Sequence, residues 1–334
     1  DADTGHIADG EKDVAQAGAG RIFTLSLLTL KPGLFTAHGR DSAGEVWCDD
    51  LGVETRQPAD AWLLGGDRVT LSSRALAAQA SHKGSFGDVA VMGGESTDSS
   101  HMAGAALLAA RAALHGGAGR VYVALLGFKG ESAMTVDPVQ PELMFRSPDA
   151  LDLKNQVVVC GCGGGDAVRA VLPRVLSTAP RLVLDADALN AIAADSQLQT
   201  LLRARHDRSY ATVLTPHPLE AARLLGTTTA KVQADRLKAA TQLSDMCKAV
   251  VVLKGSGTVI AAPADISCIN LTGNAMLATA GTGDVLAGMV GAVMAGGQQA
   301  FDAACSAVFA HGRLADDWLA ERPHETLTAS ALCY

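Results

Sequence analysis

N-A-M-L-A-T-A-G-T-G-D-V-L-A-G, residues 274–288, places one carboxylate, Asp284, at the start of an expected helix of small residues. The glycines let the backbone adopt conformations that other residues avoid, so the N–H groups beside Asp284 can point outward. The partial positive charge of a helix start suits phosphate. The pattern predicts an anion hole at Gly281, Thr282 and Gly283 with Asp284 as the base of a phosphoryl transfer. For this motif alone, an Asp that only caps its helix is the other interpretation.

Composition limits the class of protein. The chain has 334 residues, of which 48% are hydrophobic and 19% charged, as in a globular protein with one large core or two smaller ones. No uninterrupted apolar run approaches the roughly 18 residues of a membrane span. A net charge of -8 argues against a nucleic-acid surface. The seven cysteines are scattered without metal-type spacing, which is typical of reduced thiols, so we expect a cytoplasmic protein.

Short apolar strands alternate with helices along most of the chain, which predicts an α/β fold with a doubly wound, mostly parallel sheet flanked by helices. Ligands of such sheets gather beyond the carboxyl ends of the strands. Strands are expected at 89–92, 120–125, 156–160, 181–184, 212–214 and 249–253, and helices at 103–114, 220–225 and 231–246.

Two loops after expected strands carry ionisable side chains. D-A-D-A-L-N at 185–190 offers Asp185, Asp187 and Asn190, which could hold Mg²⁺ or a sugar hydroxyl, or could form an ordinary turn with Asp187 as a helix cap. L-T-P-H-P-L-E at 214–220 fixes His217 between two prolines. This histidine could donate to a substrate amide or phosphate, or could be a purely structural residue.

Two further loops are rich in glycine. L-K-G-S-G-T at 253–258 combines amides, hydroxyls and a cation suited to nucleotide phosphates, although it lacks Walker spacing and could be a simple turn. The glycines at 161 and 163–165 follow an apolar strand and allow close approach of a ligand to the backbone. Several such strand ends in one chain favour a nucleotide-dependent enzyme.

Read together and in order, these motifs strongly resemble the NAD(P)H-hydrate dehydratase family over roughly residues 80–330. The motifs that carry this resemblance also include H-K-G-S-F-G at 82–87, G-A at 104–105 and G-G-A-G at 116–119. The resemblance implies a ribokinase-like fold and the repair of NADHX and NADPHX, the hydrated forms of the reduced nicotinamide cofactors. A nucleotide's terminal phosphoryl group would pass to the hydroxyl of the hydrated ring, and the phosphate ester would then eliminate.

The resemblance also implies roles for individual residues, with ADP (or ATP) as co-substrate, Mg²⁺ bridging its phosphates and no metal ligand assigned. Asp284 would be the catalytic base. Lys254, Gly255, Ser256, Gly257, Thr258 and Gly283 would hold the nucleotide. Ala105, Gly163, His217 and Asp284 would line the hydrate site, and Asp185, Asp187, Asn190 and Asn274 would be accessory residues.

The first residues resemble a different domain. D-A-D-T-G at 1–5, the apolar stretch at 23–34 and G-E-V-W-C-D-D-L-G-V at 44–53 are similar to the end of the NAD(P)H-hydrate epimerase domain that bacterial members fuse ahead of the dehydratase. We therefore expect an epimerase remnant at 1–56, a linker at 57–70 and the dehydratase domain at 71–334. The chain would be a fragment of a two-domain protein without epimerase activity.

Departures and rival interpretations remain. The family usually has Gly-Pro-Gly where this chain has Gly161-Cys162-Gly163, and glycine where it has Leu219, which affects local geometry only. A kinase of the same fold acting on a vitamin precursor, such as hydroxyethylthiazole or pyridoxal, would use the same base and anion hole. A non-catalytic nucleotide-binding protein is the other rival, although Asp284 favours an enzyme. We expect a homo-oligomer, with a tetramer as one option.

Overall fold

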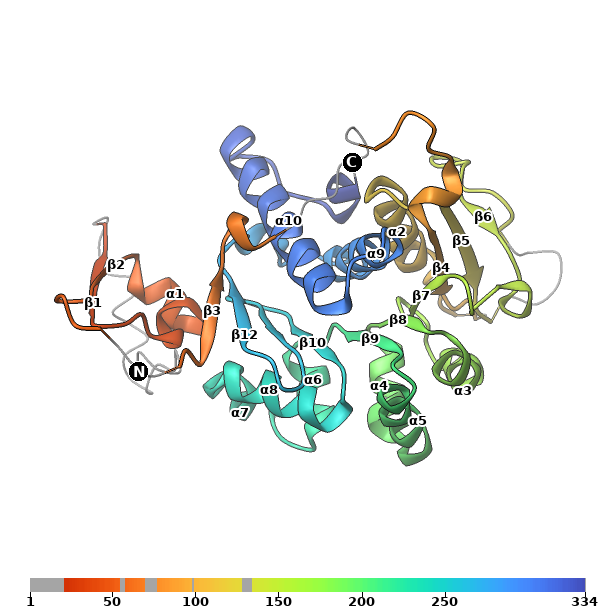
Figure 1. Cartoon of the computed structure of the whole chain (residues 1–334). Coiled ribbons are helices and arrows are strands. Elements are labelled where there is room, and N and C mark those ends of the chain that lie inside the picture. Colours follow the sequence, from red (N-terminus) through yellow and green to blue (C-terminus); the bar gives the residue numbers. More distant parts are fainter. Residues whose placement is uncertain (1–20, 55–57, 70–76, 98, 128–133, 334) are drawn as a thin grey trace.

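A ten-stranded sheet with helices on both faces forms the body of the protein (Figure 1). The computed structural model describes residues 21–54, 58–69, 77–97, 99–127 and 134–333. The strands of this sheet are β3 (Ala61–Leu64), β4 (Asp88–Gly93), β5 (Arg120–Leu125), β6 (Met144–Phe145), β7 (Val157–Cys160), β8 (Arg181–Leu184), β9 (Ala211–Leu214), β10 (Val250–Leu253), β11 (Val259–Ala261) and β12 (Ser267–Asn270).

The strand order is β3-β12-β11-β10-β9-β8-β7-β4-β5-β6. Neighbours pair in parallel, except that β11 runs antiparallel to both β10 and β12. The chain reverses direction in the order between β7 and β4, as a doubly wound sheet requires. The predicted fold class, a mostly parallel doubly wound sheet, is confirmed.

Two helical layers cover the sheet (Figure 1). On one face lie α2 (Ala103–His115), α9 (Thr282–Ala295) and α10 (Ala300–Glu321). On the other lie α3 (Val168–Thr178), α4 (Asp187–Ala194), α5 (Ser196–Asp207), α6 (Pro218–Leu225), α7 (Thr229–Ala234) and α8 (Arg236–Cys247). Short 3₁₀ helices are η2 (Pro32–Phe35), η3 (Gly66–Arg68), η5 (Lys83–Phe86), η7 (Pro148–Ala150), η8 (Ala275–Leu277) and η9 (Ala329–Cys333).

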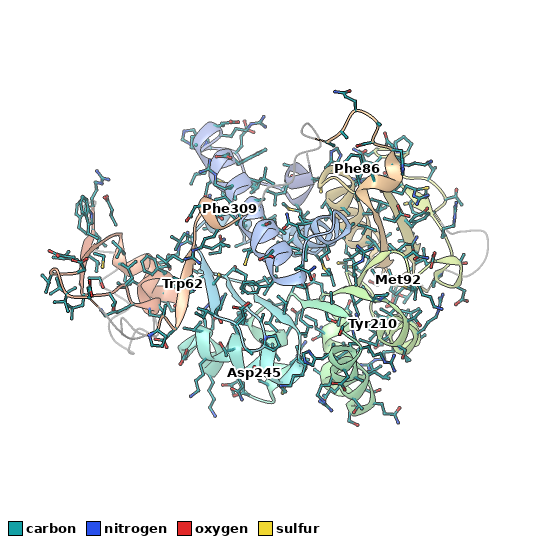
Figure 2. All side chains as sticks on the ribbon, in the orientation of Figure 1. Trp62, Phe86, Met92, Tyr210, Asp245 and Phe309 are labelled. Atoms are coloured by element: carbon teal, nitrogen blue, oxygen red, sulfur yellow. The ribbon has the colours of Figure 1, made fainter. Side chains whose placement is uncertain are left out.

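The central strands are apolar throughout because both of their faces are covered. In β7, Val157 and Val159 belong to the core cluster under α9, whereas Val158 and Cys160 belong to the cluster on the opposite face. Side chains of a strand alternate between its faces, so one short run supplies both cores. Figure 2 shows Met92 inside this body, and Trp62 on the edge strand β3.

Helices α2 and α9 pack with their backbones almost in contact, which sets the position of the α9 N-terminus. A Cβ added at Gly288 would lie only 2.0 Å from the carbonyl oxygen of Ala109. Only glycine allows this approach. The small residues of the opening motif therefore serve packing at this end of α9, and its first turn faces the strand ends.

A small N-terminal piece lies beside β3 (Figure 1). It consists of the parallel strands β1 (Phe23–Leu27) and β2 (Glu45–Asp49), joined through η2 and α1 (Ala37–Ala43). Phe23, Leu25 and Trp47 are more than half exposed, at 57%, 62% and 59%. Two paired strands are marginal on their own. Its α1 contacts the large domain, where Ala37 N donates to Ser256 O at 3.1 Å.

Two details differ from the sequence expectations. Residues 61–64, expected in a linker, form β3, which pairs in parallel with β12, and Leu64 is 1% exposed. The helix expected at 231–246 is two helices, because Asp235 caps α8 by accepting a hydrogen bond from Lys238 N. The motif at 1–5 and the start of the expected domain at residue 71 lie outside the described residues. The other domain limits stay predictions.

Candidate active site

The loops that carry the sequence motifs meet at the carboxyl ends of four adjacent strands. Residues 161–165 follow β7, Asp185 follows β8, Thr215 follows β9 and Lys254 follows β10. The first turn of α9, which holds Asp284, completes the group. Ionisable atoms of Cys162, Asp185 and Asp284 all lie within 4.8 Å of one another. The structure therefore brings together motifs that are about 120 residues apart in sequence.

Asp185 anchors the centre of the site. One of its oxygens, Oδ1, lies 2.7 Å from Lys254 Nζ and accepts a hydrogen bond of 2.7 Å from the Thr215 hydroxyl. Its other oxygen lies 4.0 Å from the Cys162 thiol. Asp185 is 1% exposed, and these partners satisfy its buried carboxylate. Because this ion pair is buried, removal of either Asp185 or Lys254 would leave the other charge without a partner, which would destabilise the protein.

The acidity of Asp284 is altered by its surroundings. Burial raises its pKa to about 7, and the nearby charge of Asp185 adds to this effect, whereas a hydrogen bond with Cys162 and the charge of Lys254 oppose it. A carboxylate that titrates near neutral pH can accept a proton from a reacting hydroxyl and release it again. Burial and a like charge in a cluster of this kind are typical of functional sites.

Lys254 keeps its positive charge although it is largely buried. Burial lowers the pKa of its ammonium group, but Asp185 and Glu220 more than compensate, and the net pKa is raised. A Cβ added at Gly283 would lie 3.1 Å from Lys254 Nζ, so the ammonium group sits against the first turn of α9. A fixed cation and a helix N-terminus together suit a phosphate.

The expected anion hole is only partly available. Gly281 begins α9 with a φ of 90°. The Thr282 hydroxyl donates to Leu277 O and Thr279 O, at 2.8 and 2.9 Å, and the Thr282 N–H points to Thr279 O at 3.4 Å. Thr282 thus closes the loop that precedes the helix. Gly283 and Asp284 are the first-turn residues whose N–H groups an α-helix leaves without an internal partner.

The loop at residues 254–258, which the sequence analysis expects to bind nucleotide, is held from inside by Arg236. Its guanidinium group donates to Leu253 O at 2.9 Å, Lys254 O at 3.1 Å and Gly257 O at 3.5 Å, and the residue is 1% exposed. Burial lowers the Arg236 pKa to about 10, which still leaves it charged at neutral pH. The sequence analysis missed this residue, because an Arg at a helix start carries no local signal of its partners.

His217 has the structural role that the sequence left as an alternative. It caps α6: its Nδ1 accepts a hydrogen bond of 3.1 Å from Leu219 N, and its own N–H donates to Glu220 Oε2 at 2.8 Å. Its Nε2 lies 3.2 Å from Glu220 Oε1. Burial raises the Glu220 pKa to about 7, against the opposing charge of Lys254. A substrate role for His217 stays a prediction, and Glu220 is a second residue that the sequence analysis missed.

Ala105 and Gly163, both expected at the hydrate site, face each other. A Cβ added at Gly163 would lie 2.8 Å from the Cβ of Ala105. Gly163 follows Cys162 directly and its carbonyl accepts a hydrogen bond of 2.7 Å from Glu95 N. The two residues therefore bring the first turn of α2 to the β7 loop, next to the carboxylate cluster.

The accessory residues other than Asp185 find partners within the protein. Asp187 accepts from Gly165 N at 2.9 Å, which joins the β8 loop to the β7 loop. Asn190 accepts from Arg223 at 2.6 Å. Asn274 accepts from Met276 N at 3.0 Å and donates to Ala315 O at 2.9 Å. These contacts orient loops of the site.

A family model described as NAD(P)H-hydrate dehydratase matches residues 89–334. The chain belongs to this family. An ADP-dependent (S)-NAD(P)H-hydrate dehydratase of Neisseria meningitidis is 44% identical over 246 residues, covering 72% of this chain and 79% of that protein. A bifunctional NAD(P)H-hydrate repair enzyme of Escherichia coli is 36% identical, covering 88% of this chain but 55% of its own length. The chain thus spans about half of that bifunctional relative.

Among solved structures, an ADP/ATP-dependent NAD(P)H-hydrate dehydratase of Bacillus subtilis, crystallised with ATP and Mg²⁺, superposes with a TM-score of 0.66 at 29% identity. The match covers 82% of this chain and 95% of that one. A hydroxyethylthiazole kinase of Pyrococcus horikoshii superposes with a TM-score of 0.51 at 17% identity, which shows a shared fold alone. The predicted ribokinase-like dehydratase resemblance is confirmed.

Proposed function

We propose that this chain dehydrates (S)-NADHX and (S)-NADPHX to NADH and NADPH, using ADP or ATP. The observation that supports it best is the partly buried Asp284 carboxylate, with a pKa of about 7, in the first turn of α9, against which the Lys254 ammonium group also lies. Asp284 would take the proton of the ring hydroxyl while that oxygen attacks the terminal phosphorus of the nucleotide. The phosphate ester then eliminates, which leaves inorganic phosphate, the restored dihydronicotinamide, and AMP from ADP or ADP from ATP.

The cations of the site would stabilise the charge that moves during transfer. Lys254 and the free N–H groups of the first α9 turn would bind the transferring phosphoryl group, and residues 254–258 would cradle the rest of the nucleotide's phosphates. Gly163 and Ala105 would line the hydrate pocket on the opposite side of Asp284. His217 would contribute to the hydrate pocket by capping α6, which fixes the conformation of the first turn of that helix.

Mg²⁺ fits this site only as a partner of the nucleotide. Lys254 and Thr215 already engage Asp185 Oδ1, so the protein offers Mg²⁺ few oxygen ligands in the part of the chain that the structure describes. Mg²⁺ commonly binds one or two carboxylates and completes its shell with water and substrate phosphates. Asp185 Oδ2 would be the protein ligand, which leaves Asp284 as the base, and the ion would neutralise phosphate charge.

The assay supplies chemically prepared NADHX and Mg²⁺ with ADP or ATP in separate reactions and follows NADH absorbance and phosphate release. NADH and phosphate in equal amounts are expected, with ADP preferred as the name of the Neisseria relative indicates. The absence of NADH with both nucleotides would refute the proposal. A stable phosphoester product would instead establish a kinase.

Some expectations stay predictions. Among the described residues, none of the helices is long and apolar enough to cross a membrane. A cytoplasmic location and a homo-oligomer remain untested, as does the absence of epimerase activity. Size-exclusion chromatography with light scattering measures the oligomeric state. An NADHX epimerisation assay tests for epimerase activity.

A further inference from the structure

The segment of η2 and α1 contacts the loop at residues 254–258 directly. Ala37 N donates to Ser256 O at 3.1 Å, and the Ser256 hydroxyl donates to Ala37 O at 3.2 Å. Residues 37 and 256 thus exchange two hydrogen bonds. The segment belongs to the N-terminal piece, which lies outside the family match at 89–334.

The loop and the segment also touch backbone to backbone at the next residue. A Cβ added at Gly257 would lie 2.0 Å from Phe35 O and 2.8 Å from Thr36 Cα, and Gly257 has a φ of 63°. Only glycine fits here. Thr36 and Ala37 are 2% and 7% exposed, and Phe35 packs against the core cluster of the adjacent helical layer. The contact is therefore a packed interface.

Arg40 links the same segment to a second loop of the site. Its Nη2 donates to Leu271 O at 2.6 Å and to Gly273 O at 2.9 Å. Those two residues directly precede Asn274 and the loop that leads to Asp284. The segment thus joins the two loops that flank the proposed phosphate site.

The backbone at Ala37 shows that this arrangement is imposed by packing. Ala37 has a φ of 48°, in the left-handed region that residues with a Cβ seldom adopt. Such a conformation is strained and persists where surrounding contacts fix it. The exchange of hydrogen bonds with Ser256 is the contact that fixes it here.

We propose that residues 35–40 act as a brace that holds residues 254–258 and 271–273 in the conformation that binds nucleotide. Arg40 is the positioning residue of this brace: it touches neither nucleotide nor hydrate, and acts through the carbonyls that it holds. The inference rests on the proposed function, because it takes residues 254–258 as the nucleotide loop. It adds a requirement for the N-terminal piece in a site otherwise built by the family domain.

The test replaces Arg40 in the full chain. Arg40→Met removes both hydrogen bonds, and the dissociation constant of ADP, measured by calorimetry with Mg²⁺, is expected to rise about tenfold. Arg40→Lys, which can reach one carbonyl, is expected to give about a threefold rise. The KM for ADP should follow, whereas the KM for NADHX and the kcat at saturating ADP should stay within about twofold.

Arg21→Met is the matched control, because Arg21 lies in the same piece and pairs only with the exposed Glu45 among its ionic contacts in the described chain. Its ADP affinity should equal that of the unaltered protein. If circular dichroism shows that Arg40→Met does not fold, the comparison uses Arg40→Lys instead.

The outcomes separate the two proposals. An unaltered protein that neither binds ADP nor forms NADH overturns the proposed function. An active unaltered protein with unchanged ADP affinity in the Arg40 variants overturns the brace alone. Tighter binding in those variants also overturns it, since the segment would then obstruct the nucleotide.

Discussion

Replacing Asp284 with asparagine should abolish turnover and make the protein more stable. Burial and the charge of Asp185 raise the Asp284 pKa from 3.8 to about 7. The ionised carboxylate is therefore less favourable in the folded protein than in the unfolded chain. Asp284→Asn keeps the shape of the side chain and removes this charge, so function and stability should change in opposite directions.

The size and sign of the effect follow from the two pKa values. Between pH 4 and 7 the folded protein binds more protons at this group than the unfolded chain does, so the stability of the unaltered protein falls as pH rises through this range and levels off above it. The full difference is at most about 4 kcal/mol at pH 8. For a chain of this size, Asp284→Asn should raise Tm by about 2 to 6 °C at pH 8, and the gain should fade towards pH 4.

The assay pairs thermal unfolding at pH 5, 6, 7 and 8 with NADH formation from NADHX and ADP. Asp166→Asn is the control, because the Asp166 side chain is 96% exposed and its loss should leave Tm nearly unchanged at every pH. The base assignment fails if Asp284→Asn retains near-normal turnover. The electrostatic argument fails if its Tm gain is absent at pH 8 or does not depend on pH.

Three further outcomes are expected. Because Asp284 must be ionised to act as a base and its pKa is about 7, kcat/KM for NADHX should fall about tenfold between pH 8 and pH 6, and a flat profile would exclude this base. Cys162→Ala removes the hydrogen bond that lowers the Asp284 pKa, so the same limb should move to higher pH, and a shift to lower pH would contradict this contact. Arg236→Met leaves Leu253 O and two carbonyls of the 254–258 loop without their donor, so denaturant unfolding should show a loss of about 2 to 4 kcal/mol and ADP binding should weaken. Unchanged ADP affinity would mean that Arg236 does not position the loop.

Most of the fold could be predicted because the large sheet is built from strong local patterns. Strands β7 and β10 carry apolar side chains on both faces, and each strand is followed by a polar or glycine-rich loop. The antiparallel strand β11, its neighbour β12 and the edge strand β3 were not predicted. β3 has only the four residues Ala61–Leu64 between punctuating residues, and its pairing with β12 is set by residues more than 200 positions away.

Residues of the candidate site could be predicted where each one stands in a short motif of polar and glycine residues. Asp284, Lys254 and Asp185 each stand in a short loop after a strand or at a helix start, and the fold brings them together. Arg236 could not be predicted, since a basic residue at the start of a helix usually faces solvent. The contact of Phe35 with Gly257 joins residues far apart in the chain, and no periodicity in either segment indicates it.

Asp185, Asp284 and Lys254 lie together in the site, and their arrangement supports Asp284 as the proposed base. Asp185 occupies Lys254 and the Thr215 hydroxyl, which fixes the ammonium group against Gly283. Asp284 is left with a buried environment, a neighbouring negative charge and only a thiol as its hydrogen-bond partner within the cluster. A carboxylate whose pKa is raised towards neutral pH is suited to proton transfer, which favours Asp284 for this role. The cation then remains available for phosphate, because its charge is held in place by the other carboxylate.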